Sequence, residues 1–134
     1  DHPMACLRPL LEPRGVRVSA SLADAALVED GEIVSVAGLV VCRQRPSTAK
    51  GTVFMTIEDE TGIANLIVRP KVWARCRRVG RHATALTAHG RLQRREGVVQ
   101  VIVRSLEDLG ADLASLDRRD EAATSLAGRA RDFR

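Results

Sequence analysis

The side chains that could carry chemistry do not form a familiar catalytic set. Glu58, Asp59 and Glu60 are consecutive at an expected hairpin turn. A solvated turn is the simpler explanation for adjacent carboxylates, and a metal site is the alternative. No Ser-His-Asp arrangement, glycine-rich phosphate loop or paired-carboxylate pattern stands out. We therefore expect no catalytic residue, no enzymatic activity and no cofactor in this chain on its own.

Cysteine and histidine spacing argues against a metal centre. The cysteines are odd in number and none belongs to a C-x-x-C pair, which favours free thiols in a reducing, cytoplasmic compartment over a disulfide framework. They are Cys6, Cys42 and Cys76. The histidines, which are His2, His82 and His89, lack the spacing of zinc ligands. We expect no metal-binding residue.

Basic residues are concentrated in the middle of the chain. Residues 31–106 contain 13 Lys/Arg and five Asp/Glu, a net charge of +8, whereas residues 1–30 and 107–134 each carry −2. Nineteen of the 21 cations are arginine, a bias that a GC-rich genome is enough to explain. Guanidinium groups nevertheless match phosphate geometry and stack on bases. The middle of the chain is therefore a candidate binding region for nucleic acid.

Length and hydropathy exclude several classes of protein. The 134 residues suit one domain, and charge and apolar content are too ordinary for a wholly disordered chain. The longest uncharged apolar run, residues 33–42, is about half of what a membrane span needs. No signal peptide opens the chain, and a first residue other than Met suggests a fragment. We expect a cytoplasmic protein without a membrane partner.

Five strands and one helix are expected to position the candidate residues. Hydrophobic periodicity predicts strands at 33–43, 52–58, 63–68, 83–94 and 98–105, and a helix at 70–79 that ends at Gly80. Gly38 interrupts the first strand as a bulge or sharp bend would. The order β-β-β-α-β-β predicts a mainly all-β protein with the OB-fold. This five-stranded Greek-key barrel binds oligonucleotides on its second and third strands and the loops beside them.

The barrel is assigned to residues 31–106, with a segment on either side. Residues 1–30 form a helical and then irregular lead-in, in which Pro9 should shorten or kink a first helix. Ser21 begins a weak capping box for a second helical stretch at 22–28. Residues 107–134 are predicted to be a mostly disordered tail.

Phe54 is the main candidate for stacking on a nucleic-acid base. It alternates with Val53, Met55 and Ile57, so it stands on the outer face if those three fill the barrel. The alternative, which we weigh equally, is that Phe54 packs under a loop or the N-terminal helix. Trp73 lies among the apolar positions of the helix and is predicted to plug the barrel rather than to stack on bases.

Cations flank the two loops that border the binding groove of an OB-fold. Three of these cations lie at the first loop and three lie at the last hairpin. In addition, an asparagine is expected on the outer face of the third strand and an arginine just after that strand. The predicted nucleic-acid-binding residues are thus Phe54 with Arg43, Arg45, Lys50, Asn65, Arg69, Arg91, Arg94 and Arg95. His89 is a further candidate, although an exposed neutral histidine is the simpler account.

Several motifs resemble the C-terminal OB region of bacterial family C DNA polymerases. They are VAGLVVCRQRP at 36–46, TAKG at 48–51, FMTIEDETG at 54–62 and NLIV at 65–68. The Arg-Gln-Arg-Pro run and the terminal RDFR at 131–134 resemble the error-prone, damage-inducible branch, and HPM at 2–4 resembles the entry into this region. The resemblance covers most of residues 2–106 and the extreme C-terminus.

This resemblance implies the last part of a much larger polymerase whose catalytic domains lie upstream. The expected function is to bind single-stranded template DNA in translesion synthesis and DNA repair, with accessory proteins as further partners. Two other functions stay open. One is a protein-docking domain for repair or polymerase partners, motivated by the acidic flanks. The other is an RNA-binding OB module that resembles an anticodon-binding domain.

Overall fold

The computed structural model describes residues 2–110 and confirms the predicted OB-fold barrel. Short 3-10 helices at 12–14, 19–23 and 47–49 lie in the connections. The main elements are α1 (Pro3–Leu11), β1 (Val16–Arg17), β2 (Ile33–Gln44), β3 (Val53–Asp59), β4 (Gly62–Val68), α2 (Pro70–His82), β5 (Ala85–Arg95) and β6 (Val98–Asp108).

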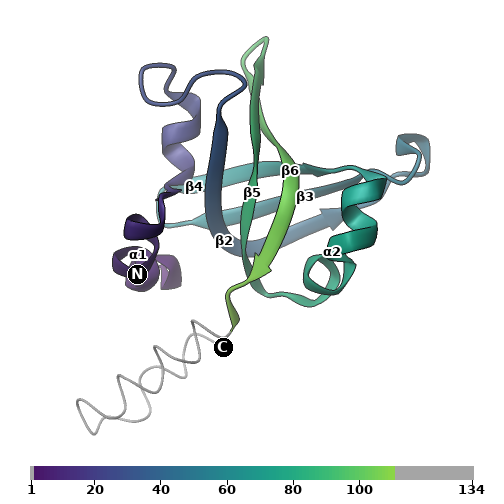
Figure 1. Cartoon of the computed structure of the whole chain (residues 1–134), viewed down its shortest axis with the longest axis horizontal. Coiled ribbons are helices and arrows are strands. Elements are labelled where there is room, and N and C mark those ends of the chain that lie inside the picture. Colours follow the sequence, from purple (N-terminus) through teal and green to yellow (C-terminus); the bar gives the residue numbers. More distant parts are fainter. Residues whose placement is uncertain (1, 111–134) are drawn as a thin grey trace, which may run out of the picture.

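Strand β2 closes the barrel because it pairs with both β5 and β3. Its first half pairs with β5 and its second half with β3, both antiparallel, and β4 pairs with β6 in parallel. In Figure 1, β2, β5 and β6 cross in front of β3 and β4, with α1 and α2 on opposite sides. Gly38 lies where β2 changes partner, and a Cβ there would be 2.6 Å from the Glu58 carbonyl oxygen. Gly38 therefore permits a close backbone approach, and the bulge itself lies between Val40 and Cys42.

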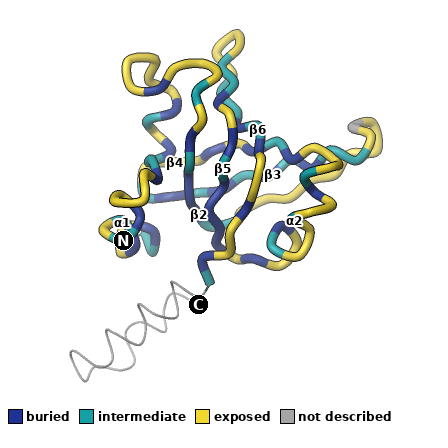
Figure 2. Tube along the Cα trace, in the orientation of Figure 1, coloured by how far each residue is buried: buried dark blue, intermediate teal, exposed yellow. Residues whose placement is uncertain are grey.

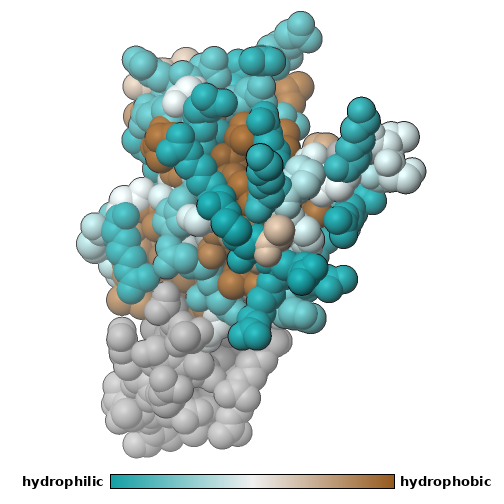
Figure 3. Space-filling model, turned by 45° about the vertical axis from the view of Figure 1, so that its right-hand side comes forward, coloured by the Kyte–Doolittle hydropathy of each residue, from teal (hydrophilic) through white to brown (hydrophobic). Residues whose placement is uncertain are grey.

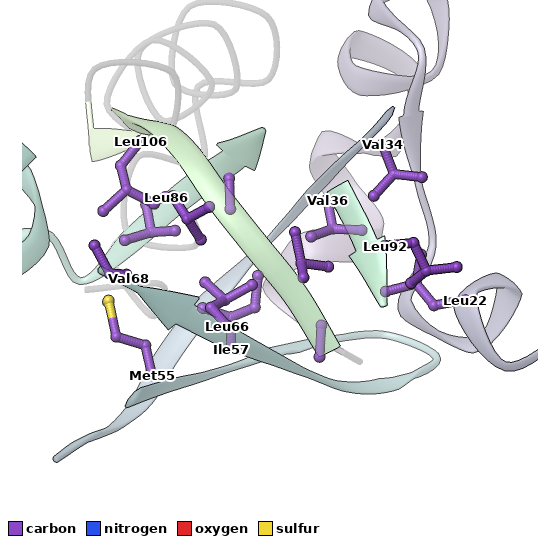
Figure 4. Close-up of a cluster of buried hydrophobic side chains, with 14 of the residues drawn as sticks. Leu22, Val34, Val36, Met55, Ile57, Leu66, Val68, Leu86, Leu92 and Leu106 are labelled. Atoms are coloured by element: carbon purple, nitrogen blue, oxygen red, sulfur yellow. The ribbon is translucent and has the colours of Figure 1, made fainter. Parts of the chain in front are cut away.

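The barrel core consists of alternate residues from each strand. Val53, Met55 and Ile57 of β3 are buried, and so are Leu66 and Val68 of β4. Figure 4 shows the side chains of Met55, Ile57, Leu66 and Val68 gathered between the strands. Figure 2 shows that buried residues are concentrated on the strands. The predicted strand parity is confirmed, so Phe54 belongs to the outer face.

A second apolar cluster lies outside the barrel, beneath α1. Met4, Leu7 and Leu11 are buried against Ala37 of β2, Ala85 of β5 and Leu109. Pro9 lies inside α1, which nevertheless continues to Leu11. β1 pairs in parallel with β2, a contact that sequence periodicity did not predict. The lead-in is therefore packed onto the barrel.

The segment at 22–28 and the end of the barrel differ from the sequence predictions. No α-helix forms at 22–28; a 3-10 helix spans Ser19–Ala23 and turns follow it. β6 continues to Asp108, so the barrel extends past the expected boundary at 106. The predicted disorder of the tail falls on residues 111–134, which lie outside the described residues. Within residues 2–110, no helix is long and apolar enough to span a membrane.

Helix α2 closes one end of the barrel through Trp73. The Trp73 side chain packs into the core with only 7% of its surface exposed, which confirms the predicted plug. Gly80 does not end the helix, which continues to His82. A Cβ on Gly80 would be 2.3 Å from the Trp73 ring, so glycine is required here for packing rather than for helix termination.

Gly80→Ala is expected to destabilise the domain by about 1–2 kcal/mol, since the Cβ overpacks the core. This loss of stability is the opposite of the usual effect, because Gly→Ala inside a helix ordinarily raises the free energy of unfolding by about 0.5–1 kcal/mol. Urea unfolding measures the difference. In a Trp73→Leu background the ring is absent, so Gly80→Ala should stabilise the domain through the higher helix propensity of alanine. Stabilisation by Gly80→Ala in the wild-type background would contradict this packing.

Candidate nucleic-acid interface

A row of side chains crosses the outer surface of the barrel at Phe54. Phe54 of β3 is paired with Ile67 of β4, Ile67 with Ile102 of β6, and Ile102 with Arg91 of β5. The first three side chains are half-buried and Arg91 is exposed. Residues paired across neighbouring strands share one face of the sheet. The row therefore joins an aromatic ring, two isoleucines and a guanidinium group on one open surface.

Polar residues continue this surface beside the row. Asn65 is exposed and paired with Thr56, whose hydroxyl donates a hydrogen bond to Asn65 Oδ1 at 3.3 Å. Arg69 follows β4 on the same parity as Ile67 and is also exposed. The prediction named Phe54, Asn65 and Arg69 but not Ile67. Ile67 could have been predicted as well, because it alternates with the core residues in the same way as Asn65 and Arg69 do.

The two loops beside the row carry exposed cations. Arg45 and Lys50 lie in the β2–β3 connection, and Arg95 ends β5. Glu96 and Gly97 both have positive φ, at 52° and 79°. Two such central residues define a tight hairpin turn whose twist matches the strands. The turn therefore fixes Arg95 at the end of the β5–β6 ladder.

Two of the predicted cations are engaged within the protein. Arg43 donates hydrogen bonds to the carbonyl oxygens of Gly80 and Ala83, at the C-terminal end of α2. Arg94 donates to the carbonyl oxygens of Leu22 and Val28 in the lead-in. Carbonyls at a helix end or in a loop lack backbone partners, and an arginine supplies donors for them. Their charge remains near the surface, but these guanidinium groups hold segments of the fold together.

His89 also has partners within the protein. It lies on β5, and its two ring nitrogens are hydrogen-bonded to Ser35 Oγ and to Glu107 Oε1. The histidine therefore links β2, β5 and β6 across the outer surface. Neither contact was visible in the sequence, because both partners are distant along the chain.

The acidic run at the β3–β4 turn connects the lead-in to the barrel. Asp59 is only 2% exposed, which corrects the expectation of a solvated turn. Its carboxylate accepts hydrogen bonds from the Ser19 N–H at 2.7 Å and from the Thr61 hydroxyl at 2.7 Å. Arg8 of α1 binds Glu60 through two hydrogen bonds, at 2.7 and 2.8 Å. Among residues 2–110, no group of His, Cys, Asp and Glu is arranged to hold a metal ion.

These contacts shift the acidity of both carboxyl groups. Burial raises the pKa of Asp59, but hydrogen bonds from Thr61 and Ser19 outweigh it, so the net pKa is below the ordinary value. The hydrogen bond from Arg8 likewise lowers the pKa of Glu60 and raises that of Arg8. Asp59 and Glu60 are therefore ionised at neutral pH and stabilise the fold.

The barrel order and the open row between basic loops define an oligonucleotide-binding class of domain. Residues 20–109 match the family model described as an OB-fold nucleic acid binding domain. The chain belongs to this family.

Curated relatives place the chain among a particular group of proteins. It is 44% identical over 133 residues to error-prone DNA polymerase 2 of Rhizobium meliloti (strain 1021), covering 99% of this chain and 12% of that protein. It is 47% identical over 120 residues to the error-prone DNA polymerase of Caulobacter vibrioides, covering 90% of this chain and 11% of that protein. The resemblance predicted from the sequence is confirmed, and the chain spans about an eighth of these relatives.

Solved structures share the same fold. Asparaginyl-tRNA synthetase from Pyrococcus horikoshii superposes with a TM-score of 0.50 and 26% identity, over 58% of this chain and 20% of that one. A putative aspartyl-tRNA synthetase from Leishmania major Friedlin gives a TM-score of 0.54 at 12% identity, over 68% and 20% of the two chains. The second likeness concerns the fold alone.

Proposed function

We propose that this domain binds single-stranded template DNA as part of an error-prone polymerase that acts in translesion synthesis and DNA repair. The observation that supports it best is the outer row of Phe54, Ile67, Ile102 and Arg91. An aromatic ring on an open sheet stacks on a base, and neighbouring cations neutralise phosphates. Unpaired bases expose their faces for such stacking, which favours a single strand.

Binding would be mainly electrostatic. Arg45, Lys50, Arg69 and Arg95 surround the row and are all exposed. Phe54 offers one stacking position, and Asn65 offers an amide that can donate to and accept from base edges. One ring and one amide give little sequence discrimination, so we infer salt-sensitive binding with weak sequence preference. The chemistry of nucleotide transfer would belong to other domains of the whole polymerase, which would be its neighbours together with accessory proteins.

Arg91→Ala/Arg95→Ala is expected to weaken single-strand binding and to reduce its salt dependence. Each lost phosphate contact lowers the slope of log affinity against log salt by about 0.7, so the double variant should lose about 1.4. Fluorescence anisotropy with a labelled single strand over a salt series measures both quantities. Arg94 is left intact because its substitution would also loosen the lead-in.

Arg17→Ala is the control for charge alone. Arg17 lies on β1 and is ion-paired with Glu32 at 3.0 Å, so its charge is already neutralised within the protein. The Arg17→Ala substitution should leave the slope of log affinity against log salt unchanged. Absent binding at low salt, or equal losses for Arg17 and Arg91 variants, would refute the proposal. Tighter binding of an RNA strand of the same sequence would favour the RNA-binding alternative, and capture of a protein partner without DNA binding would favour docking.

A further inference from the structure

The outward side of α2 carries an uninterrupted row of basic residues. Lys71, Arg75, Arg78 and His82 follow one another at spacings of four, three and four residues. At about 100° per residue these positions form a single stripe, about 16 Å long. Arg77 and Arg81 lie next to it, and α2 contains no acidic residue. The opposite side, with Val72 and Cys76, packs on the core.

These cations are not neutralised within the part of the chain that is described. Among residues 2–110, no ion pair involves α2, and Arg75 donates one hydrogen bond, at 3.4 Å, to the Arg104 carbonyl oxygen. Like charges at adjacent helical positions repel and destabilise a helix. On α2 these like charges lie together on one exposed face. A ligand with many negative charges would relieve their repulsion, so the face is suited to a polyanion.

Two hollows shape this surface and connect it to the proposed interface. A hollow of about 360 Å³ lies over Ala74, among four arginines and His82 of α2. A second, of about 460 Å³, lies between α2 and the end of β2, where Arg45 and Val53 line it. Arg81 and His82 line both hollows, so the two lie next to each other. Figure 3 brings this side forward and shows projecting hydrophilic side chains around small apolar patches.

We propose that the outward face of α2 is a second nucleic-acid surface that binds only the sugar-phosphate backbone. We call it the α2 surface, defined by Lys71, Arg75, Arg77, Arg78, Arg81 and His82. The choice of ligand rests on the proposed function, because the α2 surface continues from Arg45 beside the Phe54 row. Trp73, the aromatic residue of α2, is buried beneath it. The α2 surface exposes no Phe, Tyr or Trp ring, and its arginines match the geometry of phosphates, which a duplex presents as well as a single strand does.

The test uses this chain with two probes that separate the surfaces. One is a DNA duplex of about 24 base pairs, and the other is a single strand of about eight nucleotides, within the usual site size of an OB-fold. Arg75→Ala/Arg78→Ala should weaken duplex binding about tenfold or more at low salt and lower its salt slope by about 1.8. Binding of the short strand should stay unchanged. Arg75→Lys/Arg78→Lys keeps both charges and should restore duplex binding.

The outcomes separate this proposal from the proposed function. Unchanged duplex affinity in the Arg75/Arg78 alanine variant would overturn the α2 surface, and so would a failure of the lysine variant to bind the duplex better than the alanine variant. An equal loss of duplex binding in Arg91→Ala/Arg95→Ala would also overturn it, because the duplex would then occupy the Phe54 row. Duplex binding that depends on Arg75 and Arg78, with no binding of the short strand, would support the α2 surface while refuting the single-strand function.

Discussion

Phe54→Ala is expected to lower the affinity for a short single strand by about 5- to 150-fold, equivalent to about 1–3 kcal/mol of base stacking. The loss should be large because the alternatives on this surface are aliphatic. Ile67 and Ile102 follow Phe54 along the row and offer packing but no π-face. The other aromatic residue in the described part of the chain, Trp73, is buried in the core. One substitution therefore removes the stacking position of the proposed interface.

Phe54→Leu and Thr56→Ser provide the controls. Leucine preserves the apolar contacts of Phe54 with its neighbours but cannot stack, so its loss of affinity should approach that of alanine while its thermal stability stays near wild type. Thr56 occupies the next outward position of β3 and has no ring, and serine keeps the hydroxyl that donates to Asn65 Oδ1, so Thr56→Ser should bind almost normally. Full affinity in Phe54→Leu would mean that Phe54 serves packing alone. The salt slope should be the same in all three variants, because no phosphate contact is lost.

The side of each strand that faces the core could be predicted from the sequence because burial repeats every second residue. Val53, Met55 and Ile57 are all buried as expected, which places Phe54 outside. The same alternation overlooked the second cluster, since it treats one face of each strand as solvated. Ala37 and Ala85 are buried on the outer face because α1 covers them. Periodicity within a strand carries no information about which distant segment packs over it.

The role of each cation was less predictable than its position. Arg91 and Arg94 are close in sequence, yet Arg91 is exposed whereas Arg94 donates to two carbonyl oxygens of the lead-in. Those acceptors are backbone groups 66 and 72 residues away, and any residue type can supply a carbonyl. Because such acceptors cannot be recognised in the sequence, Arg91 and Arg94 were both predicted to bind phosphates. The need for glycine at position 80 was equally hidden in the sequence, because it arises from close packing against the Trp73 ring.

Asp59→Asn is expected to destabilise the domain by about 2–4 kcal/mol at neutral pH, because a buried carboxylate loses charge-assisted hydrogen bonds. The Asp59 side chain is fully buried, with Arg8 Nη2 at 3.5 Å and the Ser19 N–H at 2.7 Å. An amide keeps the shape but not the negative charge, and its NH₂ group faces donors that need an acceptor. Since these contacts join α1 and the lead-in to the β3–β4 turn, protection of residues 2–23 from hydrogen exchange should fall most.

The pH dependence of stability identifies the charge as the cause. The folded-state pKa of Asp59 lies below its unfolded value, so its contribution is present above the unfolded pKa and is lost as the pH falls through the folded pKa. The wild-type protein should therefore weaken from about pH 5 downward, and the gap to Asp59→Asn should narrow over the same range. Asp24→Asn is the control, because Asp24 accepts one exposed hydrogen bond from the Ala26 N–H. It should change the free energy of unfolding little at any pH, and a pH-independent gap for Asp59→Asn would show that shape rather than charge sets the stability.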